Sequence, residues 1–92
     1  MNEEEFRIIA KEKGYGEVEF LEVEPGPEEE MHSHEHSVLS FVLTGEFTMT
    51  TNEWTKVLLP GDMTENPAGT MHKVKIGPEG GSFLFAKKFH EK

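Results

Sequence analysis

A series of short β-forming segments, separated by glycine and proline, limits what this 92-residue chain can fold into. From Glu17 to Phe89, apolar and polar residues alternate over short stretches, as in strands that bury one face. The turn signals between them include Pro25-Gly26-Pro27, Pro60-Gly61-Asp62 and the glycine-rich stretch at residues 77–81. Many short strands of this kind predict an all-β sandwich or barrel, and the length predicts that residues 1–92 form a single domain.

The same alternation predicts where the strands lie. We expect strands over residues 17–24, 38–44, 47–51, 54–59, 63–66, 71–76 and 82–89. A phase slip between Phe20 and Leu21 indicates a bulge in the first of them. Gly45 is expected to reverse the chain after the second, because glycine tolerates positive φ. Thr51-Asn52-Glu53 is expected to form a tight hairpin connection.

The N-terminal segment has a different pattern, which predicts a short helix over residues 2–13. Asn2 can serve as the N-cap, acidic residues follow in the first turn, and lysines occupy the last turn. Gly14 follows as a stop signal. A strand is the alternative here, because the phenylalanine and two isoleucines of residues 6–9 favour β structure.

Composition and charge exclude several kinds of function. The formal net charge of −9 disfavours binding to nucleic acid or to an anionic membrane surface. The absence of cysteine excludes disulfides and thiolate metal sites. The acidic N-terminus does not resemble a signal peptide, and no apolar run approaches the roughly 20 residues of a membrane helix. We therefore expect a soluble, cytoplasmic protein.

Three of the five histidines lie at alternate positions in one short stretch, as His32, His34 and His36. In an extended strand, residues two apart point to the same face, so two of these rings could converge on one ion. Neutral imidazole is a common ligand of transition metals. A solvated polar patch is the alternative interpretation of this stretch.

The spacing of glycines and histidines around this stretch resembles the first motif of the cupin family. That motif has a glycine, His-x-His after five residues, a glutamate, and a second glycine. Gly26, His32, His34 and Gly45 match it at the expected spacing, whereas Val38 stands at the glutamate position.

The second cupin motif also has a counterpart. Gly61 is followed at the expected spacing by Pro67, Gly69 and His72, whereas Ile76 stands where the motif has asparagine. The alternation of residues 72–76 places His72 on the same face as Val74 and Ile76, which is the apolar face.

The resemblance implies a jelly-roll barrel, also called a double-stranded β-helix, with a metal site at His32, His34 and His72. The metal would be a divalent transition ion such as iron, nickel, zinc, manganese or copper. Without the motif glutamate, such a site keeps the ion's full charge and open coordination positions. The resemblance also implies a homodimer and a small-molecule ligand in the barrel. We expect the barrel to be lined by Val38, Val42, Val74, Ile76 and either Phe83 or Phe85.

Two functions follow from such a site, and a barrel without any site is a third alternative. One is a dioxygenase or isomerase that acts on a small acid or carbonyl compound, and the other is a non-catalytic ligand-binding or sensing module. His36 and Glu65 are the candidates for proton transfer, although His36 could equally be an exposed loop residue. His90 is expected to be solvated and idle.

One strand is apolar on both of its faces. Leu39, Phe41 and Leu43 form an outward row that needs cover. We expect either a second subunit or the N-terminal segment to provide it. Ahead of the histidines, residues 28–30 form a run of three glutamates that we expect to be a solvated acidic rim.

Overall fold

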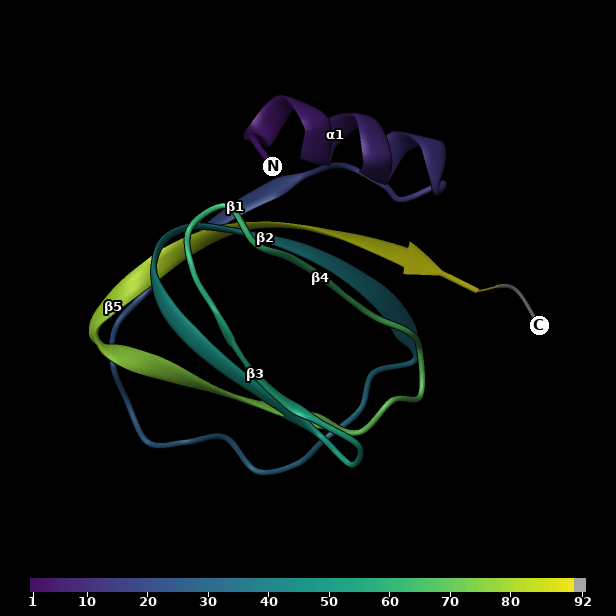
Figure 1. The fold of residues 1–92 in the computed structure, drawn as a ribbon. Helices are drawn as coiled ribbons and strands as arrows, with labels where there is room; N and C mark the ends of the chain where they lie inside the picture. The colour runs from purple at the N-terminus through teal and green to yellow at the C-terminus, as the bar shows by residue number, and fades with distance from the viewer. Residues whose placement is uncertain (91–92) are drawn as a thin grey trace.

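The computed structural model describes residues 1–90, which form one helix and a five-stranded sheet (Figure 1). The predicted mostly-β fold with one short N-terminal helix is confirmed. In chain order the elements are α1 (Glu3–Glu12), β1 (Glu19–Val23), β2 (His36–Thr51), β3 (Thr55–Leu58), β4 (Met63–Asn66) and β5 (His72–Phe89). Within residues 1–90, no helix has the length and apolar character needed to cross a membrane.

Two long strands, β2 and β5, organise the sheet. They pair antiparallel from His36↔Phe89 to Thr51↔His72, and both bend sharply, so that the sheet folds over on itself into a barrel (Figure 1). β1 extends the sheet beside the C-terminal half of β5, while β4 and β3 pair with the N-terminal and C-terminal halves of β2. The barrel therefore has two layers, and the bent strands β2 and β5 run through both. One layer also contains β1 and β4, and the other also contains β3.

The bend in β2 corrects a prediction. Residues 38–44 and 47–51 belong to one continuous strand, so the prediction that Gly45 reverses the chain is wrong. Gly45 does adopt a positive φ of 84°, but it lies between two register shifts that bend the strand. Bulges of this kind bend a strand and change which residues face inward. Val42 points into the barrel before the bend, and Phe47 points into it after the bend. Strict alternation would place residues five apart on opposite faces, so the register shifts have changed which positions face inward.

β5 bends opposite this point and corrects a second prediction. The glycine-rich stretch at residues 77–81 does not end the strand, because β5 continues from His72 to Phe89. Gly45 pairs with Gly81, and the two backbones lie in close contact. A Cβ added to Gly45 would overlap the carbonyl oxygen of Gly80 and lie 2.7 Å from the Cα of Gly81. Glycine is therefore required here for close approach as well as for its φ.

The shorter strands follow the sequence more closely. β4 matches the prediction, and residues 51–54 form the expected connection between β2 and β3. β1, however, has no bulge, because its pairing with β5 runs without a shift from Glu19↔Phe85 to Val23↔Gly81. The phase slip has another cause. Phe20 and Leu21 point to opposite faces of an edge strand, and their side chains are 59% and 44% exposed, respectively.

The predicted helix is confirmed, and the alternative of a strand over the same residues is wrong. Asn2 and Glu5 form a reciprocal capping box, and Gly14 follows the helix with a φ of 82°. The helix lies across the outside of the sheet (Figure 1). Its fully buried Phe6 stacks on Phe41 with ring centroids 5.4 Å apart. The N-terminal segment therefore covers the outward apolar row of β2.

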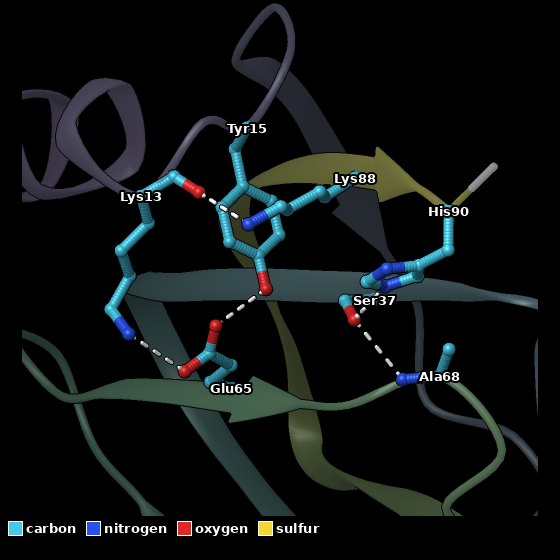
Figure 2. A network of polar contacts seen from close by, with 7 residues as sticks. All are labelled: Lys13, Tyr15, Ser37, Glu65, Ala68, Lys88 and His90. Atoms are coloured by element: carbon cyan, nitrogen blue, oxygen red, sulfur yellow. Dashed lines mark hydrogen bonds and ion pairs between the residues drawn. The ribbon is translucent and has the colours of Figure 1, made fainter.

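A polar network fastens the end of the helix to the sheet (Figure 2). The Tyr15 hydroxyl donates to Glu65 Oε2 at 2.6 Å, and Lys13 Nζ donates to Glu65 Oε1 at 3.1 Å. Lys88 Nζ donates to the carbonyl oxygen of Lys13 at 2.7 Å. Glu65 pairs with Leu39, whose side chain packs under the helix, so Glu65 also lies on the outer face. Glu65, which we predicted as a candidate for proton transfer, is thus held on the outer face by Tyr15 and Lys13.

His90 has a structural contact that we did not predict. Its Nε2 lies 2.9 Å from the hydroxyl of buried Ser37, which also accepts the backbone N–H of Ala68 at 3.1 Å (Figure 2). The serine hydroxyl has one proton and two lone pairs, so besides accepting from Ala68 it can donate to the imidazole or accept from it, according to the tautomer of His90. His90 is exposed, as predicted, but it is not idle, because its ring contacts Ser37.

The close contact at the bend gives a graded test of three glycines. Gly69→Ala should cost about 1–2 kcal/mol of unfolding free energy, because Gly69 has a φ of 84° but open space around it. Gly45→Ala should cost about 3 kcal/mol or more, because overpacking adds to the same backbone strain. Gly26→Ala, in open space, is the control and should change stability by less than about 0.5 kcal/mol. Urea denaturation measures all three, and equal losses for Gly45 and Gly69 would contradict the close contact.

The polar network gives a pH-dependent test. Donation from Tyr15 holds the pKa of Glu65 below its ordinary 4.5, and burial, followed by Glu65 itself, raises the pKa of Tyr15 to about 12. The bond therefore stabilises the fold fully between pH 4.5 and pH 10.0. Its contribution is lost as the pH falls through the lowered pKa of Glu65, and it is lost again as the pH rises through the pKa of Tyr15, about 12. Tyr15→Phe should cost about 1 kcal/mol at neutral pH, since the pair is partly exposed.

Urea denaturation of wild type and Tyr15→Phe across this pH range measures the difference. The cost of the substitution should shrink as the pH falls below 4.5 and through the lowered pKa of Glu65. A cost that stays constant from acid to neutral pH would show that the hydroxyl does not interact with the ionised carboxylate.

Candidate metal centre

Backbone pairing brings the two histidine-bearing segments together. The N–H of His32 donates to the carbonyl oxygen of His72 at 2.9 Å, and the N–H of His72 donates to that of His32 at 2.8 Å. The N–H of Gly69 donates to the carbonyl oxygen of His34 at 2.9 Å. Residues 24–35 are otherwise a loop, and β2 begins only at His36, so side-chain alternation along a strand is not what brings these histidines together. The histidines meet because the loop pairs with the start of β5.

The three predicted histidines converge. The ring centroid of His32 lies 5.0 Å from that of His34 and 4.6 Å from that of His72, and the centroids of His34 and His72 are 5.2 Å apart. One ligand nitrogen from each ring lies within 4.8 Å of the other two. His72 is buried, as the alternation of β5 predicted, and the other two are half-buried. The cluster could therefore hold a metal ion, with a small inward movement to reach bonds of about 2.1 Å.

Hydrogen bonds orient two of these rings for metal binding. Nδ1 of His32 lies 2.8 Å from the carbonyl oxygen of Glu30, and Nδ1 of His72 lies 2.9 Å from that of Thr70. A carbonyl oxygen can only accept, so each Nδ1 carries the proton, and the lone pair of each neutral ring is on Nε2. Metal-binding histidines typically donate their second ring N–H in this way. The residues present thus fit a transition-metal ion.

Electrostatics favour a neutral ring at His34. Burial is the largest cause that lowers the pKa of His34 below its ordinary 6.5, and the neighbouring His72 and His32 lower it further. The negative charge of Glu29 acts in the opposite direction. A neutral imidazole has the free lone pair that a metal needs.

His36 lies beside the cluster rather than within it. Its ring stacks on that of His34 with centroids 5.0 Å apart, and on the other side it lies 5.1 Å from Phe89. The three converging ligand atoms do not include His36. Its role in proton transfer stays a prediction.

A mainly apolar cavity of about 300 Å³ lies inside the barrel, and its lining includes Glu29, whose carboxylate lies 3.9 Å from the ring of His32. Of the expected lining, Val42, Val74, Ile76 and Phe83 do face it, whereas Val38 and Phe85 are not among its lining residues. Val74 and Ile76 follow His72 on the same face of β5, so the cavity begins next to the cluster. Further lining comes from Leu21, Val23, Glu29, Ser40, Phe47, Met49, Leu58 and Thr64.

Sequence reasoning missed the special position of Glu29. We expected residues 28–30 to be an undivided acidic rim, but the structure gives each of the three a different role. Glu28 pairs with Lys73 at 2.6 Å, Glu29 lies 3.9 Å from Nε2 of His32 and lines the cavity, and Glu30 offers its carbonyl oxygen to His32. Three identical neighbouring residues carry no sequence signal that separates them.

Known proteins are similar to this chain in sequence and in fold. The family model described as Cupin domain matches residues 19–85, which include both histidine-bearing segments. No curated protein matches the sequence.

Solved structures share the fold. An RmlC-like cupin from Shewanella frigidimarina NCIMB 400 is 28% identical with a TM-score of 0.68, over 82% of this chain and 67% of that one. KdgF from Halomonas sp. is 23% identical with a TM-score of 0.64, over 79% of this chain and 69% of that one. DMSP lyase DddQ from Ruegeria pomeroyi DSS-3 is 21% identical with a TM-score of 0.68, over 77% of this chain and only 36% of that one. At these identities the last two show a shared fold alone.

The assigned ring protonation can be measured directly. In metal-free protein at neutral pH, nitrogen NMR of the histidine rings should show His32 and His72 with the proton on Nδ1, because backbone carbonyls accept from that atom. The exposed His90 provides an internal comparison. Protonation of Nε2 in both rings would contradict the orientation that prepares the centre for an ion.

Proposed function

The chain belongs to the cupin family, and we propose that it binds one divalent transition-metal ion through His32, His34 and His72, together with a small organic ligand in the adjoining cavity. The observation that carries this proposal is the convergence of three imidazole nitrogens within 4.8 Å of one another. The carbonyl oxygens that fix the tautomers of two rings support it.

The chemistry of the centre indicates the class of ligand. Three neutral imidazoles leave the charge of a divalent ion uncompensated, so the ion favours an anionic oxygen ligand such as a carboxylate or an enolate. The cavity next to it is lined mainly by aliphatic and aromatic side chains. A small acid or carbonyl compound with an apolar body matches both features, with its oxygen atoms at the histidines and its body against Val42 and Val74.

We propose a dioxygenase or isomerase reaction on such a compound. A bound ion would supply Lewis-acid polarisation of a carbonyl oxygen and would orient the ligand. His36, stacked against His34, is the residue placed to exchange a proton near the mouth of the barrel. One structural neighbour is named as a lyase, which supports the view that this fold accommodates chemistry on small molecules. We further propose a cytoplasmic homodimer, on the grounds given by composition and family resemblance.

Metal binding is tested on protein purified without a histidine tag. We expect about one equivalent of Zn²⁺ or Ni²⁺ per chain by calorimetry and elemental analysis, and a loss of affinity of at least about a hundredfold for His72→Ala, because a ligand is removed. His90→Ala is the matched control and should bind as wild type does, since His90 contacts Ser37 instead. Equal metal content in wild type and in a variant lacking all three histidines would refute the proposal.

Turnover separates the two functional alternatives. Product formed from small acids or diketones by metal-loaded protein would assign the enzymatic role. Ligand-induced thermal stabilisation with no product under oxygen would assign the non-catalytic binding or sensing role instead.

A further inference from the structure

Glu29 occupies a position shared by the metal centre and the cavity. Its Oε2 lies 3.9 Å from Nε2 of His32, the nitrogen left with a lone pair by the bond from Nδ1 to Glu30. It also lines the cavity, and among the described residues that line it, no other side chain is ionisable. Glu29 therefore places a carboxylate beside the His32 ring at a mainly apolar wall, next to the group of three converging imidazole nitrogens but not yet part of it.

Contacts on either side hold the loop that presents this carboxylate. On one side, Glu28 forms an ion pair with Lys73 at 2.6 Å, and on the other, His32 exchanges two backbone hydrogen bonds with His72. Glu29 thus lies between two attachments to β5 that are four residues apart in the loop, which leaves its backbone little freedom to leave the site. Its side chain is 53% exposed and can adjust its rotamer.

The distance between the two atoms fits shared coordination better than direct bonding. At 3.9 Å, carboxylate oxygen and imidazole nitrogen are too far apart for a hydrogen bond. Two ligands that each lie about 2.0–2.2 Å from one ion are separated by roughly 3–4 Å, depending on the angle at the ion. The observed separation falls within that range.

The three histidines and the rest of the two motifs provide no negative charge to offset that of a divalent ion. Cupin motifs have a glutamate at the position of Val38, and a valine side chain cannot coordinate. An uncompensated dication beside an apolar cavity is costly because that environment solvates charge poorly. A single carboxylate would halve the net charge of the ion with its protein ligands.

We infer that Glu29 supplies the fourth, anionic ligand of the metal centre, from the N-terminal side of the histidine pair, in place of the missing motif glutamate. This inference rests on the proposed metal-binding function. It predicts a centre of three imidazoles and one carboxylate, and it assigns the small-molecule ligand to the coordination positions that remain.

Affinity for metal alone tests the inference without any substrate. Glu29→Gln, which keeps size and removes charge, should weaken Zn²⁺ binding by about tenfold or more in competition with a chromophoric chelator. Glu30→Gln removes the same charge one residue away, where only the carbonyl oxygen contacts His32, and should change affinity by less than about threefold. The visible spectrum of Co²⁺-loaded protein should change for Glu29→Gln and stay constant for Glu30→Gln.

The outcomes separate the two levels of the proposal. If wild type binds Zn²⁺ tightly and both variants bind equally well, or lose affinity equally, Glu29 is not a ligand, while the three-histidine centre stands. If wild type binds no Zn²⁺, the proposed function and the inference both fail. Thermal unfolding of the metal-free variants shows whether the loop substitutions leave the fold intact, as their exposed positions predict.

Discussion

The centre depends on two reciprocal backbone hydrogen bonds between His32 and His72. Residues 24–35 form a loop without continuous strand pairing, so side-chain alternation alone would not direct these rings to one point. The backbone pair fixes the loop against the start of β5, and the bond from Gly69 to His34 adds a second attachment. Because backbone groups form these contacts, all three imidazoles remain available for other ligands.

The bend shared by β2 and β5 creates the space next to that pair. It folds one sheet into two layers, which gives the sheet an outer face under α1 and an inner face around the cavity. The outer face is closed by Phe6, which packs against Leu39 and Phe41. The inner face is closed only in part, and Val42, Phe47 and Met49 surround the space that remains. The core under α1 and the cavity thus lie on opposite faces of the same strands.

The sequence predicted local features well and long-range geometry less well. The helix after Asn2, the strand at residues 63–66 and the inward direction of His72 follow from short-range rules of capping and alternation. Gly45 and residues 77–81 looked like chain reversals, because a glycine that permits a turn also permits a close contact between bent strands. Only the paired partner distinguishes these uses. Likewise, nothing in the run of residues 28–30 distinguishes Glu29, whose environment arises when the loop crosses to β5.

In the proposed metal centre, the pairing of His32 with His72 would also link stability to metal supply. The three imidazoles lie together only when segments about 40 residues apart have folded against each other, so an ion that needs all three binds the folded chain alone. Mass action then raises the free energy of unfolding by about 1.4 kcal/mol for each tenfold excess of free metal over its dissociation constant. In this chain, which has no cysteine to form a disulfide, an ion bound at the proposed centre would then act as a cross-link between residues 32 and 72 of the fold.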